Sequence, residues 1–312
     1  MKICNGLIII VIMFSHVLVA RLTVLDHTPV KVEMVSTYEM RFCYISFIKI
    51  DGVMYLIKQK KSQFLRKILS VVRDAVTAHI AENFGIAHQV DIIPAGIEFP
   101  GKPRKDWPAT IHTIAPGKMI KDKGQNRHYK HIKLQQKEEG FTYQMLQWMN
   151  MYPQLIMIMA LDIFVCNHDR HKGNLFYDPK TDSFCAIDMD SAFRYNLSSI
   201  ACKNFMAMIN DRRFKFSVKD IQTLGKLNNC LKFLIEKYPS VETLKIYDDF
   251  AQKAGFIPGS DLYTEKVRTE LVSNRKIILQ SYKDIQQLVQ IIDQLVKKVK
   301  TAYNIHHFPI KK

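Results

Sequence analysis

The sequence predicts an α+β protein with two lobes, a small β-rich lobe followed by a mainly helical one. Three observations predict this: residues 29–59 read as strands, the pattern becomes helical after Ser62, and the chain from Phe141 onward is mainly helical. The length of 312 residues allows two or three lobes and a sizeable core. Hydrophobic residues are 47% and charged residues 24%, which is a globular composition and excludes a disordered chain.

The first predicted elements form a β-hairpin. Residues 42–48 are rich in aromatic and β-branched side chains, Asp51-Gly52 is a hairpin turn signal, and residues 53–58 form the return strand. The hairpin places Lys58 at the end of a strand.

A helix and two further strands complete the predicted small lobe, which covers residues 21–117. Apolar residues recur at helical spacing over 62–84, and Gly85 is a helix stop signal. Residues 90–95 and 109–114 are predicted as strands.

The larger lobe and a helical C-terminal extension are predicted over residues 118–312. Residues 120–140 are basic and polar, which predicts a mobile insertion or a solvated helix. One strand-like unit lies at 174–192. The last long segment carries an apolar stripe, which indicates core packing or, as the alternative, a basic helix lying on a membrane; the stripe comprises Leu288, Ile291, Ile292, Leu295, Val296 and Val299.

Residues 1–20 predict a secretory signal peptide. Lys2 precedes an apolar segment, and Ala20 offers a small residue at the cleavage position. The run is short for a membrane-spanning helix, which needs about 20 apolar residues. An uncleaved anchor is the first alternative, and a mis-assigned start or a buried first strand is the second. We therefore expect a secreted or exported protein.

The formal net charge is +16, which favours polyanionic partners such as nucleic acid, acidic lipid surfaces or phosphorylated ligands. No zinc-finger, basic-zipper or RNA-binding signature is present, so nucleic acid is not the expected partner. Five of the 6 cysteines would remain after cleavage of the signal, and an odd, widely spaced set predicts buried thiols rather than a disulfide framework.

Two segments of the larger lobe carry the chemistry. Residues 166–174 form a dense polar loop directly after an apolar run, and residues 186–193 hold acids among small and apolar side chains. Phosphoryl transfer needs an Asp for the attacking hydroxyl, an Asn and an Asp for the metal ion, and a Lys for the phosphates. Asp169, Asn174 and Asp188, with Lys58 on the hairpin, supply these groups.

The same segments resemble a family of kinases. Asn167-His168-Asp169-Arg170-His171-Lys172-Gly173-Asn174 resembles the N-x-D-R-x-x-x-N catalytic loop of the phosphatidylinositol 3-/4-kinases and the HipA-like kinases. Ala186-Ile187-Asp188-Met189-Asp190-Ser191-Ala192-Phe193 resembles the A-I-D-x-G-x-A-F metal motif of type II phosphatidylinositol 4-kinases. Tyr55-Leu56-Ile57-Lys58 is similar to the lysine strand of that superfamily, and the helix from Arg73-Asp74 to Gly85-Ile86 is similar to one of its helices. The resemblance covers about residues 30–195.

The resemblance implies a two-lobed protein-kinase-like fold that binds ATP and Mg²⁺ between its lobes. By motif position, Lys58 binds phosphate and Asp74 orients it. Asp169 is the catalytic acid/base, Asn174 belongs to the catalytic loop, and Asn174 and Asp188 bind Mg²⁺.

Three departures from the family pattern bear on ATP handling. The loop before the second strand lacks glycine, and we expect Ser36, Thr37 and Arg41 to take over phosphate contacts there. The helix acid is Asp74 rather than the longer Glu. Asp190 replaces the usual Gly and is a competitor of Asp188 for the metal ion.

Individual residues also have ordinary structural interpretations. Lys58 reads as a surface lysine beside Lys60 and Lys61, and Asp74 as a solvated helix residue. A metal site made by Cys166, His168 and His171 lacks a second cluster at ligand spacing.

Two further polar residues are predicted to shape the catalytic loop rather than to react. Arg170 is expected to pair with a neighbouring acid, and Asp162 on the preceding helix is expected to help shape the loop. His171 is expected to pack and hold the loop.

The sequence therefore predicts a kinase whose acceptor is a phosphoinositide at an acidic membrane or a protein hydroxyl. The alternatives are a catalytically inactive kinase fold that binds nucleotide or a partner, and a polyanion-binding protein in which the motifs are accidental. A signal peptide on a kinase implies delivery to an ATP-containing compartment, such as a host cell or a eukaryotic secretory lumen, where the Asn196-Leu197-Ser198 sequon would matter.

Overall fold

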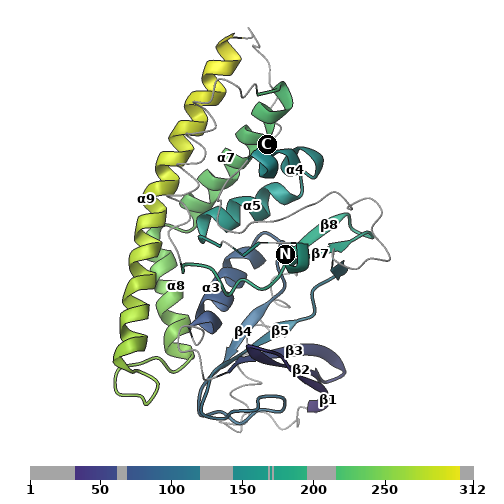
Figure 1. Ribbon diagram of the computed structural model, residues 1–312, viewed down its shortest axis with the longest axis vertical. Helices are drawn as coiled ribbons and strands as arrows, with labels where there is room; N and C mark the ends of the chain where they lie inside the picture. The colour runs from purple at the N-terminus through teal and green to yellow at the C-terminus, as the bar shows by residue number, and fades with distance from the viewer. Residues whose placement is uncertain are drawn as a thin grey trace, which may run out of the picture.

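The computed structural model describes residues 32–61, 69–119, 143–167, 169–170, 172–194 and 216–302. The predicted signal peptide, the basic stretch at 120–140, His168, His171 and Asn196 lie outside them. Figure 1 shows a β-rich part at one end and a helical part at the other. The predicted two-lobed α+β architecture is confirmed, in the layout expected of a protein-kinase-like fold.

The small lobe is a five-stranded antiparallel sheet in the order β1-β2-β3-β5-β4. Its strands are β1 (Val32–Glu39), β2 (Cys43–Ile50), β3 (Val53–Lys60), β4 (Val90–Ile93) and β5 (Ala109–Thr113). Asp51 and Gly52 both have positive φ in the β2–β3 turn, as the hairpin signal predicted.

The two faces of β3 have different surroundings because successive side chains alternate across a strand. Ile57 is fully buried in a small apolar cluster with Ile48 and Ile111. Lys58 and Lys60 therefore lie on the opposite face, which is the face towards the helical lobe.

Helix α3 (Ser70–Glu82) is almost entirely buried between the sheet and helix α8 (Ser240–Lys253). Gly85 follows with φ +65°, which is the left-handed conformation expected of a helix stop. Burial on both sides fixes α3, and with it the polar side chains of its second turn, relative to both lobes.

The chain leaves the first sheet at Gly117. Strand β6 (Lys118–Met119) joins a second sheet with β7 (Leu175–Asp178) and β8 (Ser183–Ala186). A Cβ atom at Gly117 would lie 2.3 Å from the backbone oxygen of Tyr177, and φ is +82°, so only glycine fits this crossing. The second sheet positions the two predicted site segments, which flank it.

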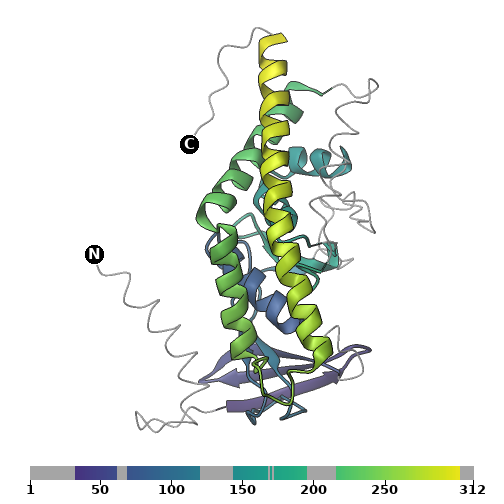
Figure 2. The same ribbon diagram turned by 90° about the vertical axis from the view of Figure 1, so that its left-hand side faces the viewer.

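The helical part comprises α4 (Tyr143–Met151), α5 (Leu155–Phe164), α7 (Val218–Lys237), α8 and α9 (Glu265–Ala302). A capping box between Ser217 and Asp220 begins α7. Figures 1 and 2 both show α9 running along the helical part and reaching down to the sheet. Contacts of α9 with α5 and α7, and of α8 with α3 and β4, let the C-terminal helices bridge the two lobes.

The apolar stripe of α9 packs into the main core, so the core-packing interpretation is confirmed. Leu288, Ile292 and Leu295 are buried there. This leaves that face unavailable to a membrane. In the part of the chain that the structure describes, no helix combines the length and apolarity needed to cross a bilayer.

The described cysteines are free thiols, as predicted. Cys43, Cys166 and Cys185 are buried, and Cys230 is half-buried. Burial raises the pKa of the Cys185 thiol to about 11, so this thiol stays protonated at neutral pH.

Candidate active site

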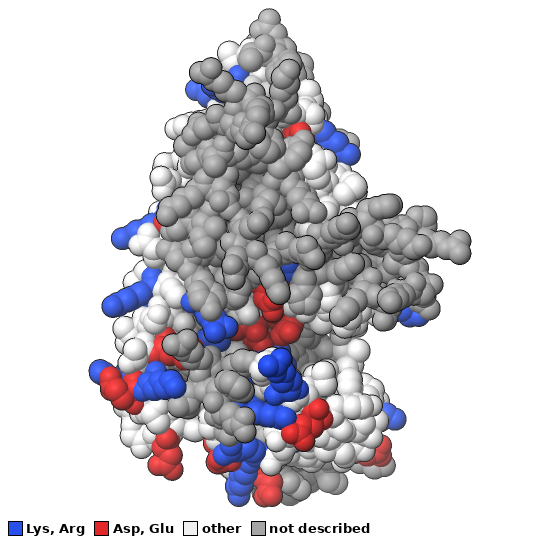
Figure 3. Space-filling view, in the orientation of Figure 1, with Lys and Arg blue, Asp and Glu red and all other residues white. Residues whose placement is uncertain are grey.

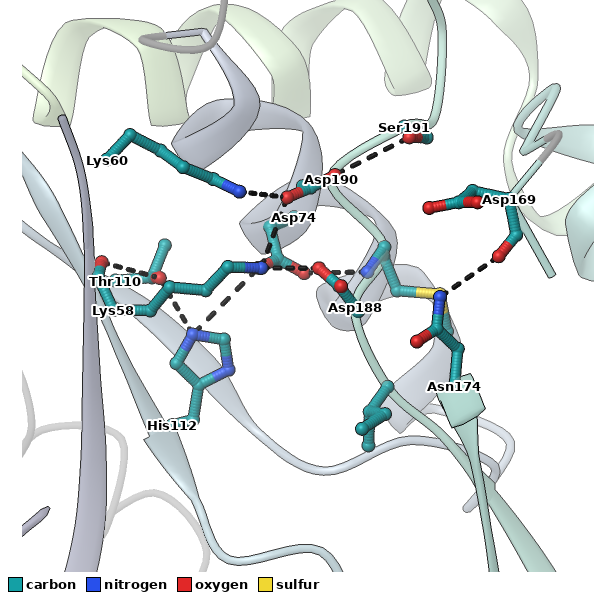
Figure 4. A network of polar contacts seen from close by, with 12 residues as sticks. Lys58, Lys60, Asp74, Thr110, His112, Asp169, Asn174, Asp188, Asp190 and Ser191 are labelled. Atoms are coloured by element: carbon teal, nitrogen blue, oxygen red, sulfur yellow. Dashed lines mark hydrogen bonds and ion pairs between the residues drawn. The ribbon is translucent and has the colours of Figure 1, made fainter. Parts of the chain in front are cut away.

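Lys58 lies at the centre of a group of carboxylates (Figure 4). Its ammonium forms ion pairs with Asp188, with Asp190 Oδ2 at 3.1 Å and with Asp74 Oδ2 at 3.7 Å. Burial by itself would lower the pKa of Lys58, but the three carboxylates raise it well above its ordinary value. Lys58 is therefore a fixed cation at neutral pH, which a phosphate-binding group requires.

A second lysine shares one of these carboxylates. Lys60 forms an ion pair with the same Asp190 Oδ2 atom that Lys58 contacts, and its side chain is only 11% exposed. Burial alone would raise the pKa of Asp190, but the two ammonium groups hold it well below its usual range. The sequence motifs assign no role to Lys60. The strand period of two, which puts it on the face of Lys58, would have found it.

Residues 186–193, which carry Asp188 and Asp190, are called the acidic loop here. Helix α3 holds this loop through two consecutive residues. Asp74 Oδ1 accepts a hydrogen bond from the Met189 backbone N at 3.0 Å, and Arg73 Nε donates to the Asp190 backbone oxygen at 2.9 Å. Burial raises the pKa of Asp74 to about 6 against the pull of Lys58. Asp74 thus positions two parts of the site, Lys58 and the acidic loop. The sequence predicted its role toward Lys58 but not its role in holding the loop.

A buried histidine pair lies beside Asp74. His112 Nε2 is 2.7 Å from Thr110 Oγ1 and 3.9 Å from Asp74 Oδ2, and His112 Nδ1 is 2.9 Å from His88 Nε2. Burial lowers the pKa of His88 to about 4 and that of His112 well below its ordinary value. Both rings are therefore neutral at pH 7.

Residues 166–174 form the loop that is predicted to be catalytic, called the catalytic loop here. Arg170 holds this loop together from inside. It is fully buried and forms two hydrogen bonds to the Asp162 carboxylate, at 2.9 and 3.0 Å. It also donates to the backbone oxygens of Asn174 at 2.7 Å and Ile187 at 3.0 Å. Both expectations are confirmed: Arg170 pairs with a neighbouring acid, and Asp162 shapes the loop.

Asp169 and Asn174 are joined by the loop itself. The Asn174 amide donates to the Asp169 backbone oxygen at 3.0 Å, and the Asp169 backbone N donates to Asn167 Oδ1 at 3.2 Å. Asp169 is exposed, whereas Asn174 is buried. In Figure 4 the Asp169 carboxylate points towards Asp188 and Asp190. The Asp169 carboxylate is therefore accessible to a substrate hydroxyl, while the Asn174 side chain is held in place by burial and its hydrogen bond.

Asp188 has an unusual backbone conformation. Its φ is +54°, in the left-handed region, where a non-glycine residue costs of order 1–3 kcal/mol. The Ile187 backbone N donates to the Asn174 oxygen at 3.1 Å, which links the acidic loop to the catalytic loop. In the view of Figure 4 Asp188 lies between Lys58 and Asn174. The strain at Asp188 is maintained by these surrounding contacts.

The donor set of Asp188 and Asn174 fits a magnesium ion. Both offer oxygen atoms, which Mg²⁺ prefers, and Mg²⁺ is commonly held by one or two carboxylates together with substrate phosphates. Asn174 uses its N–H group on Asp169, which leaves its Oδ1 atom as the acceptor side of the amide. Within the described residues, no three His, Cys, Asp or Glu side chains form a metal group by themselves. The ion would therefore depend on phosphate oxygens as well.

On the face drawn in Figure 3, Asp and Glu side chains lie next to Lys and Arg side chains near the middle. Of the three carboxylates around Lys58, that of Asp188 is the most exposed, at 39%, so it is the most accessible to a ligand from solution.

Thr37 does not join this group. It pairs in register with Ser46 of β2, which pairs with Ile57 of β3. Cross-strand partners share a face, so Thr37 lies on the face opposite Lys58. Its hydroxyl is 3.0 Å from Ser46 Oγ. Thr37 therefore lies away from the ion pairs around Lys58, and its phosphate contact stays a prediction.

Ser36 and Arg41 occupy different places near the β1–β2 turn. Ser36 is inside β1 rather than in a loop, and it pairs with Phe47 on the face of Lys58. Arg41 lies in the turn, with its guanidinium 4.9 Å from the Phe42 ring centroid. Neither contributes to the ion pairs around Lys58, and their phosphate contacts stay predictions.

The comparisons with known proteins give no sequence match and only distant similarity to solved structures. No protein-family model matches the chain, and the sequence of no curated protein does. Among solved structures it is similar to the Helicobacter pylori proinflammatory kinase CtkA, with 12% identity, a TM-score of 0.45 and coverage of 85% of this chain and 99% of that one. It is also similar to a Ralstonia eutropha protein described as an aminoglycoside phosphotransferase, with 9% identity, a TM-score of 0.29 and coverage of 88% and 98%. Both names denote phosphotransferases, but at these TM-scores function has to be argued from the site itself.

Proposed function

We propose that this chain is a phosphotransferase that moves the γ-phosphoryl group of ATP to a hydroxyl group in a Mg²⁺-dependent reaction. In type it would resemble the phosphatidylinositol 3-/4-kinases and the HipA-like kinases. The acceptor we propose is a phosphoinositide or a protein.

One observation carries this proposal. A lysine from β3, an acid from α3 and an acid from the loop after β8 form a partly buried ion-pair group, although Lys58 and Asp188 are 130 residues apart in the chain. The loop of Asp169 and Asn174 is hydrogen-bonded to that acidic loop through Arg170 and Ile187. Chance motifs would not assemble a phosphate-binding cation, metal-binding oxygens and an exposed carboxylate in one place.

Each residue has a defined task in such a reaction. Lys58 would bind phosphate oxygens of ATP as a permanent cation, and Asp74 would keep the acidic loop and the lysine in register. The exposed Asp169 would orient the acceptor hydroxyl and take its proton. The hydroxyl oxygen then forms a bond to the γ-phosphorus while the bond to the bridging oxygen breaks, and ADP leaves.

Asp188 and Asn174 would hold the magnesium ion. When bound, Mg²⁺ supplies charge neutralisation at the phosphate oxygens. The backbone hydrogen bond from Ile187 N to Asn174 O links the two segments that carry these proposed ligands.

The basic charge of the chain supports an acidic partner surface. A net charge of +16 favours approach to phosphoinositide-containing membranes, and equally to acidic proteins. Export directed by residues 1–20, with action in an ATP-containing compartment, is part of this proposal and lies outside the described residues.

A second candidate function is a catalytically inactive module that binds nucleotide or a partner. The observation that favours it is the ion pairing of Lys58 with three carboxylates, together with a β1–β2 turn that lacks glycine.

A labelled-phosphate experiment separates the two candidates. Residues 21–312 are incubated with Mg²⁺ and γ-labelled ATP, offered phosphatidylinositol vesicles and a generic protein acceptor in parallel, and compared with Asp169→Ala. The proposal predicts label in lipid or protein that is lost in the variant. Nucleotide binding without transfer would indicate the inactive module, and neither binding nor transfer would overturn both.

A further inference from the structure

Asp190 creates a specific electrostatic problem for Lys58. Three carboxylates surround the Lys58 ammonium, and Asp190 Oδ2 is one of its close partners, at 3.1 Å. A lysine that binds nucleotide phosphates has to give up contacts with its carboxylates, and each additional carboxylate makes that exchange less favourable. Asp190 adds a third carboxylate to the two that Asp74 and Asp188 already place beside Lys58.

The backbone of Asp190 is held next to the lysines. Its backbone oxygen accepts from Arg73 Nε at 2.9 Å, and the Oδ1 atom of its side chain is 3.5 Å from Ser191 Oγ. Its side chain is 17% exposed, so water screens its charge only in part. In the described part of the chain its ion pairs are with Lys58 and Lys60.

We propose that Lys60 is a positioning residue that serves as the counter-ion of Asp190 and thereby leaves Lys58 free to bind nucleotide phosphates. This inference rests on the proposed function, because it assigns Lys58 to the nucleotide. Lys60 occurs two residues after Lys58 on the same face of β3, so both ammonium groups reach the same Asp190 oxygen.

The local charges explain why both lysines are needed. Asp74, Asp188 and Asp190 face two ammonium groups in this structure. Without Lys60, the same three carboxylates would compete for Lys58 alone. A nucleotide would then have to displace Lys58 from a carboxylate with no other cation.

A double-mutant cycle on ATP affinity tests this role. The dissociation constant of a fluorescent ATP analogue with Mg²⁺ is measured for the wild-type chain, Lys60→Met, Asp190→Ala and the double variant. We expect Lys60→Met to weaken binding about tenfold, as loss of one partner of a partly buried charge pair does. Asp190→Ala should bind more tightly than the wild type, and adding Lys60→Met to it should change nothing further.

Lys61→Met is a matched control. Lys61 is the next residue, pairs with the exposed Glu39 and packs near Tyr44, so it takes no part in the Asp190 ion pairs. Its removal should leave ATP affinity unchanged, while Lys60→Arg should restore the affinity that Lys60→Met loses.

The outcomes separate this inference from the proposed function. A Lys60→Met effect that persists in full in the Asp190→Ala background would show direct phosphate binding by Lys60 and overturn the inference. Wild-type affinity in Lys60→Met would overturn it too. If Lys60→Met does not fold, Asp190→Ala alone gives the test. Binding of the ATP analogue by Asp190→Ala that is weaker than, or equal to, binding by the wild type would overturn the inference. A folded wild-type chain that binds no nucleotide would overturn the proposed function, and the inference with it.

Discussion

Replacement of Arg170 by Met should lower the stability of the protein, because it removes the guanidinium that holds the catalytic loop and adds no larger side chain. Arg170 is fully buried, and its guanidinium satisfies both oxygens of the Asp162 carboxylate. Asp162 itself is 3% exposed, and among the described residues its carboxylate has one further partner, the Asn167 amide at 2.8 Å. Within this part of the chain, Arg170→Met therefore leaves a buried carboxylate with one hydrogen bond and no cation.

The expected loss of stability is large. Removal of one partner of a buried ion pair costs about 3–5 kcal/mol, because the other charge stays buried without compensation. At about 2–4 °C per kcal/mol for a large chain, the melting temperature should fall by about 6–20 °C. Circular dichroism on heating, and urea unfolding of the same samples, measure the change.

The pairing of the two residues provides the control. Arg170→Met combined with Asp162→Leu removes both charges, which is often neutral for stability, so the double variant should regain most of the loss. It should not regain phosphoryl transfer, because Arg170 also holds the backbone oxygens of Asn174 and Ile187. If the free energy of unfolding of Arg170→Met alone lies within about 1 kcal/mol of that of the wild type, this reasoning is refuted.

Two further predictions concern pH and the C-terminal helix. Burial lowers the pKa of His88 to about 4, so the unfolded chain takes up this proton first as the pH falls. Stability should therefore be full above about pH 6.5 and should fall by about 2 kcal/mol for this residue by pH 5. His112 adds to the loss in the same direction. Urea unfolding at pH 7 and pH 5 should show a smaller drop for His88→Gln, and an equal drop would contradict the assignment. In α9, Glu270 forms an ion pair with Arg73 at 3.2 Å. Glu270→Gln should weaken this contact and lower the free energy of unfolding by about 1–2 kcal/mol. Glu265→Gln, in an exposed pair on the same helix, should have no measurable effect in the same melts.

The sheet and the main helices follow from local patterns in the sequence. The Asp51-Gly52 turn and the alternation in residues 53–58 predicted the hairpin, and both residues of that turn have the expected positive φ. The apolar stripe ending in Val299 predicted the packed face of α9. These features depend on residues close together in the chain, so the sequence shows them directly.

The site was only partly predictable. The motifs identified Lys58, Asp74 and Asp188 because their spacing matches a known arrangement, and the structure brings the three together. The face on which Thr37 lies could not be predicted, because a register shift between Met34 and Ser36 decides it. Such an irregularity leaves no signal in the local residue pattern.

Long-range support could not be predicted at all. Arg73 and Glu270 are 197 residues apart, and the Cys166–Ser281 contact at 2.7 Å spans 115 residues. Neither pair belongs to a motif or a periodic pattern. Their pairing is decided by how α9 packs across both lobes, which is a property of the whole fold.

ATP binding with and without Mg²⁺ tests the central claim most directly. Isothermal titration of the folded chain with ATP, in Mg²⁺ or in EDTA, should show affinity that depends on the metal ion. Asp188→Asn should lose that metal dependence, and Asp169→Asn should keep it, because Asp188 and Asn174 are assigned to the ion and Asp169 is not. Equal affinity in EDTA, or unchanged Mg²⁺ dependence in Asp188→Asn, would contradict the account.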